Sequence, residues 1–188
     1  FLGTGLLGAN FTKALLAKGE SLQVWNRTVG KARALEAFGA HVFEHPADAV
    51  KGAERIHITL SDDASVDAVL AQAAAGMAPG TILFDHTTTS REGAIARTRD
   101  WGAKGLVYIH APVFMGPSNA LDSSGFMLIS EDAALTRRDR VALRFLVAEQ
   151  VAAGAGTGVT GSGCRLVAAL GRLRGRLTFG LVEDDVLV

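Results

Sequence analysis

The chain has 188 residues, 48% of them hydrophobic, and it carries 19 basic and 19 acidic side chains. A net charge of zero provides no global field for nucleic acid or an acidic membrane surface, so we expect a small-molecule partner. The single cysteine, Cys164, excludes an intramolecular disulfide and a cysteine-rich metal site, and it fits a reducing compartment. With no membrane-length apolar stretch and no signal segment, the sequence predicts a cytoplasmic protein.

The chain opens on a glycine-rich turn, Gly-Thr-Gly-Leu-Leu-Gly at residues 3–8. In a strand that turns into a helix, Gly3 would permit the tight turn, Gly5 the close approach of a pyrophosphate, and Gly8 close packing against the sheet. The helix that follows has one apolar face, made of Leu7, Phe11, Ala14 and Leu15. Only two residues precede the turn, whereas a central strand needs about five, so we expect a shortened first strand.

The second strand indicates which dinucleotide is bound. Its apolar run ends in Asn26, Arg27 and Thr28, where a site for NAD usually has a carboxylate for the ribose 2′-hydroxyl. Asn26 can hydrogen-bond a ribose, while Arg27 and Thr28 offer a cation and a hydroxyl to a 2′-phosphate. The sequence therefore predicts NADP as the cofactor, although an exposed polar turn would also explain these residues.

Strand-like and helical patterns alternate along the rest of the first 150 residues. The expected strands cover residues 22–26, 40–43, 55–60, 81–85, 106–110 and 126–130. Helix starts are expected at Ser61 and at Thr89, which forms a capping box with Glu92. The pattern predicts an α/β fold of the Rossmann type, a doubly wound, mostly parallel sheet in one domain at residues 1–150.

The last part of the chain, residues 151–188, has a different composition. Five glycines fall within residues 154–163, and arginines alternate with leucines and further glycines after Cys164. Because each glycine inside a helix costs about 1 kcal/mol relative to alanine, a stable isolated helix is not expected here. We interpret the segment as a glycine-rich hinge followed by the truncated remnant of a helical domain.

Three loops at the carboxyl ends of predicted strands are the places where a doubly wound sheet binds ligands. Residues 59–62 could lie along the nicotinamide ribose or simply cap a helix, and residues 85–90 concentrate hydroxyls where a cofactor or a carboxylate could bind. The third loop, residues 110–117, is stiffened by two prolines. His110 at its start is a candidate general base, but a structural hydrogen bond is the simpler interpretation.

Taken together, these segments resemble the β-hydroxyacid dehydrogenase family, which includes 3-hydroxyisobutyrate dehydrogenase, glyoxylate/succinic semialdehyde reductases and the NADP-binding domain of 6-phosphogluconate dehydrogenase. The resemblance covers residues 1 to 130 and rests on FLGTGLLG, VWNRT, DHTTTS and HAPVFMG, in that order. It implies hydride transfer between a nicotinamide cofactor and a small hydroxy acid, aldehyde or imine, and it allows for a homodimer. The cofactor contacts expected from the motifs are Gly3, Thr4, Gly5, Leu6, Leu7, Gly8, Asn26, Arg27, Thr28, Leu60, Ser61 and Thr88.

Two departures from the family pattern affect the expected chemistry. Its substrate loop normally reads Ser-Gly-Gly, whereas this chain has Phe114, Met115 and Gly116 as expected substrate contacts, which implies a larger or more apolar substrate. The family's catalytic lysine is also absent, and Arg165 is the nearest cation to that position. An arginine polarises an oxygen but transfers protons poorly at neutral pH, and losing such help typically costs about 10²–10⁴-fold in rate. We therefore expect a weak or inactive oxidoreductase, or alternatively a non-catalytic NADP-binding module or fragment.

Overall fold

The computed structural model describes residues 1–129. Their helices are α1 (Leu6–Ala17), α2 (Val29–Arg33), α3 (Pro46–Ala49), α4 (Asp63–Ala73), α5 (Arg91–Gly102) and α6 (Pro117–Leu121). Their strands are β1 (Gln23–Val24), β2 (His41–Val42), β3 (Arg55–Ile58), β4 (Ile82–Asp85), β5 (Val107–His110), β6 (Val113–Phe114) and β7 (Phe126–Met127). None of the helices in this part of the chain has the length and apolarity that a membrane crossing requires.

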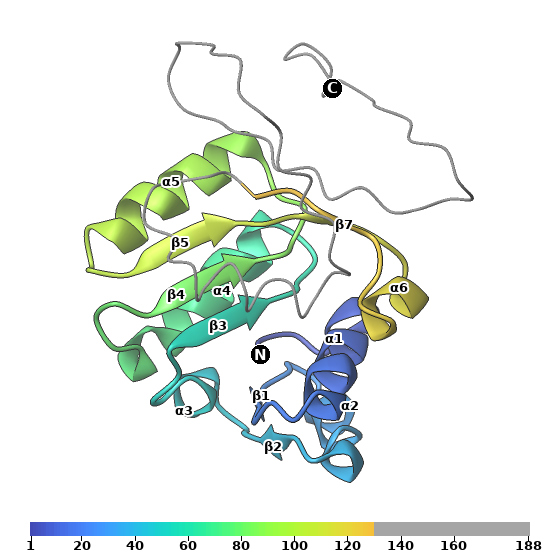
Figure 1. Ribbon diagram of the computed structural model, residues 1–188. Helices are drawn as coiled ribbons and strands as arrows, with labels where there is room; N and C mark the ends of the chain where they lie inside the picture. The colour runs from blue at the N-terminus through green and yellow to red at the C-terminus, as the bar shows by residue number, and fades with distance from the viewer. Residues whose placement is uncertain (130–188) are drawn as a thin grey trace, which may run out of the picture.

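The strands β1 to β5 run parallel and are joined through the first residues of the chain. Strand β1 pairs with β2, while β3, β4 and β5 pair in that order. Leu2 forms parallel bridges to Trp25, just after β1, and to Ile58 of β3. The amino-terminal residues thus occupy the central position between the two halves, as Figure 1 shows near the label N. The expected Rossmann-type, mostly parallel sheet is confirmed.

Helices cover both faces of this sheet. Successive side chains of a strand point to opposite faces, so each face presents apolar side chains to the helices on its side. On one face, Phe84 and Ile109 pack with Phe11 and Leu15 of α1 and with Ala120 of α6. The other face carries Leu83 and Tyr108 against α4 and α5, whose buried residues include Val66, Leu70 and Trp101. Figure 1 shows α1, α2 and α6 gathered on one side and α4 and α5 on the other. This double covering explains why β3, β4 and β5 are almost completely buried.

The region after β5 differs from the sequence-based expectation. Residues 110–117 were expected to form a loop, but Val113 and Phe114 form β6, which pairs antiparallel with β7. The strand expected at residues 126–130 is therefore the second strand of a ribbon and does not extend the parallel sheet. Two paired residues per strand are too few to give an alternating pattern that a sequence reader could recognise.

Two helix caps lie one residue later than expected. Helix α4 is capped by Asp62, whose carboxylate accepts from the backbone N of Ser65 at 2.7 Å. Helix α5 is capped by Ser90, whose hydroxyl accepts from the backbone N of Gly93. Both pairs have the spacing of a standard N-cap, so the expected caps at Ser61 and Thr89 and the capping box with Glu92 were wrong.

Candidate functional site

The glycine turn has the geometry that a close-approaching ligand requires. Gly3 has a φ of +92°, and a Cβ there would overlap the carbonyl oxygen of Thr59. A Cβ on Gly8 would overlap the carbonyl oxygen of Gly3 and the hydroxyl of Thr59. Gly5 has no atom within 4 Å of its hypothetical Cβ, so the outer side of the turn is open. As predicted, Gly3 lies in a tight turn, Gly8 packs closely against that turn, and Gly5 leaves open space beside it.

The open side of the turn also carries the amino terminus of α1. Gly5 is the N-cap residue, it makes no side-chain cap, and no acidic residue lies in the first turn. The first N–H groups of a helix have no intrahelical acceptor, and with the helix dipole they favour an anion. Leu6, 78% exposed, leaves the approach to these groups free. The turn therefore fits a pyrophosphate on its chemistry and on its open space.

Asn26 connects the glycine turn to the end of β1. Its Oδ1 accepts from the backbone N of Thr4 at 2.9 Å, and its Nδ2 donates to the carbonyl oxygen of Thr28 at 3.0 Å. The Thr4 hydroxyl is buried and has no hydrogen-bond partner among the residues described. Both ends of the Asn26 amide are thus occupied by the chain itself, which fixes the turn relative to the loop that follows β1.

Arg27 and Thr28 are exposed in that loop, next to Asn26. Within residues 1–129, Arg27 makes no ion pair, whereas Arg33 on α2 is paired with Glu44 at 2.9 Å. An unpaired guanidinium beside the mouth of a dinucleotide turn is available to bind a phosphate through two parallel hydrogen bonds. The assignment of Arg27 and Thr28 to a 2′-phosphate stays a prediction.

The loops after β3 and β4 lie together beside the glycine turn. The Thr59 hydroxyl donates to the carbonyl oxygen of Gly3 at 2.7 Å, and the backbone N of Leu60 donates to the Thr87 hydroxyl at 3.0 Å. Ser61 and Thr88, both expected to contact the cofactor, are exposed at this edge. The structure therefore brings the predicted cofactor residues of the described segment to the carboxyl edge of one parallel sheet.

His110 lies at the same edge, where its Nε2 is 3.1 Å from the carbonyl oxygen of Thr87 and 3.1 Å from the Thr89 hydroxyl. A carbonyl oxygen only accepts, so Nε2 carries the proton and is not available as a base. This geometry supports the structural interpretation of His110. It also explains why Thr89 does not cap α5, because its hydroxyl is directed to the histidine.

The expected substrate residues lie on the ribbon and at its exit. Phe114 is 58% exposed and pairs across the ribbon with Phe126, which is also exposed at 40%. Met115 is half-buried against the core on the α1 side, and the backbone N of Gly116 donates to Asn119 Oδ1 at the start of α6. Phe114 is therefore the residue of this trio whose side chain is free to meet a ligand. Arg165, the expected catalytic cation, lies outside the described residues.

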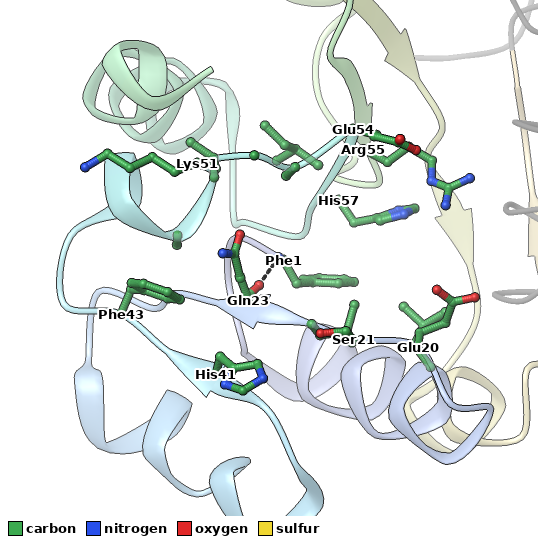
Figure 2. A pocket seen from close by; sticks show the side chains of 17 residues that line it. Phe1, Glu20, Ser21, Gln23, His41, Phe43, Lys51, Glu54, Arg55 and His57 are labelled. Carbon is green, nitrogen blue, oxygen red and sulfur yellow. Dashed lines mark hydrogen bonds between the residues drawn. The ribbon is translucent and has the colours of Figure 1, made fainter. Parts of the chain in front are cut away.

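A cavity of about 630 Å³ lies at the opposite edge of the sheet. Its lining includes Gln23, His41 and Arg55, the first residues of β1, β2 and β3, and Figure 2 shows these around the ring of Phe1 with His57 above it. Ligands of doubly wound folds bind outside the carboxyl ends of the strands. This cavity at the amino ends is therefore separate from the candidate cofactor site.

One buried group behind the loops was not predicted from the sequence. Arg97 of α5 is only 4% exposed and contacts Tyr108, Asp63 and Asp67. A signal was present, because Arg97 follows Ala94 and precedes Trp101 on the buried stripe of the helix. A charged residue on an apolar stripe is rarely buried without partners, so the position could have been singled out.

The family described as the NAD binding domain of 6-phosphogluconate dehydrogenase matches residues 1–145. The chain belongs to this family. A curated relative, glyoxylate/succinic semialdehyde reductase 1 of Arabidopsis thaliana, is 29% identical over 138 residues, which are 72% of this chain and 48% of that protein. The predicted resemblance to the β-hydroxyacid dehydrogenases is confirmed, and the relatives of the chain include proteins named as oxidoreductases.

Solved structures give the same result for this member of the 6-phosphogluconate dehydrogenase domain family. A 3-hydroxyisobutyrate dehydrogenase of Mycobacterium tuberculosis superposes with a TM-score of 0.75 at 24% identity, covering 79% of this chain and 51% of that one. An imine reductase from Myxococcus stipitatus in complex with NADP⁺ gives 0.72 at 28% identity, covering 78% and 51%. The chain thus spans about half the length of these relatives. The matched part corresponds to the nicotinamide dinucleotide-binding domain of the family.

Proposed function

We propose that this chain binds NADP and belongs to an oxidoreductase that transfers hydride between nicotinamide and a small hydroxy acid, aldehyde or imine. The observation that carries the proposal is the open glycine turn, with Arg27, which makes no ion pair in the described part of the chain, exposed in the loop that Asn26 ties to it. Bound nicotinamide would supply the hydride. The residues of the chain would place the pyrophosphate at α1, the 2′-phosphate at Arg27 and Thr28, and the ribose on the nicotinamide side near Leu60, Ser61 and Thr88. The single Cys164 supports a cytoplasmic setting.

The proposed substrate has an apolar part. Relatives with this fold carry names of aldehyde reductases and imine reductases, so both carbonyl and imine groups are candidates. In this chain Phe114 presents an exposed ring at the carboxyl edge, beside that of Phe126. The Phe114 ring would bury its apolar surface against an apolar part of the substrate. The Ser-Gly-Gly of the family pattern would instead offer polar groups at this position.

Proton transfer is the weak element of the proposed reaction. His110 donates its Nε2 proton to the carbonyl oxygen of Thr87, so the ring nitrogen that faces the loop after β4 does not supply a base. At the position of the family's lysine the sequence offers Arg165, which polarises an oxygen but exchanges protons poorly at neutral pH. We therefore propose tight nucleotide binding with slow turnover. The second candidate, a non-catalytic NADP-binding module, predicts the same binding with no turnover.

The test is a titration of the purified chain with NADPH and with NADH, followed by nicotinamide fluorescence. The proposal predicts tighter binding of NADPH, because a charge-assisted contact to the 2′-phosphate is worth about 1.5–3 kcal/mol. In an Arg27→Asp variant this preference should fall by about ten-fold or more. Arg33→Glu is the matched control, since it reverses a nearby charge that is already paired with Glu44.

Two outcomes would contradict the proposal, and a further assay separates its two forms. Equal NADPH affinity in wild type and Arg27→Asp would contradict the assignment of the 2′-phosphate to Arg27. Binding of neither nucleotide by the wild type would refute the proposed function. If NADPH binds, incubation with small aldehydes and cyclic imines separates slow turnover from the non-catalytic candidate.

A further inference from the structure

Arg97 is a buried cation that uses all three nitrogens of its guanidinium. Its Nε donates to the Tyr108 hydroxyl at 2.9 Å, one terminal nitrogen to Asp67 at 3.0 Å and the other to Asp63 at 2.6 Å. The side chain is 4% exposed. Burying a guanidinium is costly unless it is paired and hydrogen-bonded, so the two carboxylates and the hydroxyl that meet its three nitrogens indicate a built arrangement.

The first branch of hydrogen bonds reaches the start of α5. Asp63 lies in the first turn of α4 and receives Arg97 on Oδ1. Its Oδ2 accepts from the backbone N of Ser90 at 2.9 Å. The pKa of the Asp63 carboxyl lies below its usual value, first because of the Ser90 N–H and further because of Arg97, so it stays ionised at neutral pH. Arg97 thereby holds the loop that precedes α5 against the first turn of α4.

The second branch reaches the loops through the sheet. Tyr108 accepts from Arg97 and donates to Asp85 Oδ2 at 2.5 Å, while Asp85 Oδ1 accepts from the backbone N of Thr87 at 2.9 Å. Because arginine can only donate, the Tyr108 proton is directed to Asp85. Burial, with Asp85 beside it, raises the pKa of Tyr108, so the hydroxyl keeps that proton. The Thr87 hydroxyl then accepts from the backbone N of Leu60.

Both branches end in the two loops assigned to the nicotinamide side of the cofactor. The first fixes Ser90 relative to α4, and the second fixes Thr87 relative to Leu60. The exposed residues Ser61 and Thr88 lie between these fixed points in the sequence. In contrast, the glycine turn is held by Thr59, at the base of the loop after β3, and by Asn26, and neither side chain has a hydrogen bond to Arg97, Tyr108 or Asp85.

We propose that Arg97 is a positioning residue for the nicotinamide half of the cofactor, acting through the loops after β3 and β4. The inference rests on the proposed function, since it presupposes nucleotide binding at this edge. It makes a selective claim, because removing Arg97 should disturb the nicotinamide half of the site and leave the adenosine half intact. A residue that merely stabilised the fold would affect both halves alike.

The test compares Arg97→Met with the wild type for binding of NADPH and of 2′,5′-ADP, which carries only the adenosine half. Methionine keeps much of the apolar stem and removes every donor. The Kd for NADPH should rise by about ten-fold or more, while the Kd for 2′,5′-ADP stays within about two-fold. Arg99→Met is the matched control, because this arginine on the same helix is exposed and paired with Asp100; it should change neither constant.

Tyr108→Phe keeps the ring and removes the hydroxyl that links Arg97 to Asp85, so it tests the second branch in a gentler variant. It should weaken NADPH and spare 2′,5′-ADP in the same way, with folding of each variant checked by circular dichroism. Equal weakening of both ligands, no weakening of either, or loss of the fold in Tyr108→Phe as well as Arg97→Met would overturn the proposal. A wild type that binds 2′,5′-ADP and NADPH upholds the proposed function whatever the variants do, whereas one that binds neither refutes both.

Discussion

The buried histidine pair His57 and His86 predicts a loss of stability in mild acid. His86 Nδ1 lies 3.0 Å from the carbonyl oxygen of Ala111, so it donates there, and its Nε2 accepts from His57 Nδ1 at 3.0 Å. The two rings are stacked and lie among Phe1, Phe11 and Phe84. His86 Nε2 cannot take up a proton without losing the hydrogen bond from His57 Nδ1.

Burial lowers the pKa of His86 from 6.5 to about 4, and burial together with His86 lowers that of His57. Between these pKa values the unfolded chain binds more protons than the folded one, so stability falls as the pH falls. The contribution of His86 is fully present above its unfolded pKa of 6.5 and is lost as the pH approaches about 4. For one group the loss is about 1 kcal/mol at about pH 5.5 and about 3 kcal/mol in full.

The assay is urea unfolding at about pH 8 and about pH 5.5, a range in which carboxylates with ordinary pKa values stay ionised in both states. The double variant His57→Phe/His86→Phe removes all four ring nitrogens of the two histidines and keeps aromatic rings in the stack. Its loss of stability between the two pH values should be smaller than that of the wild type by at least about 1 kcal/mol. The comparison is with the wild type so that the contributions of all other titrating groups cancel.

His41→Gln is the control, since His41 is an exposed histidine on β2, and its pH dependence should equal that of the wild type. The reasoning fails if the double variant loses as much stability on acidification as the wild type does. It fails equally if His41→Gln flattens the profile as strongly as the double variant, because burial would then not be the cause.

Two further substitutions test the glycine turn. Gly8→Ala should destabilise the chain by about 1–3 kcal/mol in urea unfolding and weaken NADPH, because the added methyl group overlaps the Gly3 carbonyl, whereas Gly30→Ala on open helix surface should be neutral or slightly stabilising. Thr4→Val should raise the unfolding free energy by about 1 kcal/mol, since it removes a buried hydroxyl without a partner, and a clear loss of stability would mean that the hydroxyl is bonded after all.

The sequence was sufficient to predict the sheet and the glycine turn for a physical reason. Parallel strands buried on both faces read as continuous apolar runs, and such a sheet requires helices between its strands. The turn needs glycine wherever a Cβ would meet backbone, as at Gly3 and Gly8. Motifs enforced by local sterics are visible in the sequence because few other residues would fit.

The parts that were missed depend on contacts between distant residues. Ser90 caps α5 in place of the expected Thr89, whose hydroxyl lies 3.1 Å from Nε2 of His110, 21 positions away in the sequence. The ribbon of β6 and β7 forms because Val113 and Phe114 pair with Met127 and Phe126, which follow α6 in the sequence. Such a pairing leaves no periodic pattern in either short strand. The partners of Arg97 come from α4 and β5, so its burial could be suspected from α5 alone, but its role could not.

The two halves of the candidate site are held by different physical means, and this separates nucleotide specificity from hydride geometry. The adenosine half depends on sterics and short bonds, with Gly3 fixed by Thr59 and Thr4 by Asn26, and leaves Arg27 at an exposed position. The nicotinamide half depends on a buried, charge-assisted network whose members lie far apart in sequence. Changes at Arg27 can therefore alter the choice of nucleotide without moving the loops after β3 and β4. Under the proposed function, changes in the buried network should move Leu60, Ser61 and Thr88 more than Thr59 and the glycine turn, and so disturb the nicotinamide ring with little effect on which nucleotide is preferred.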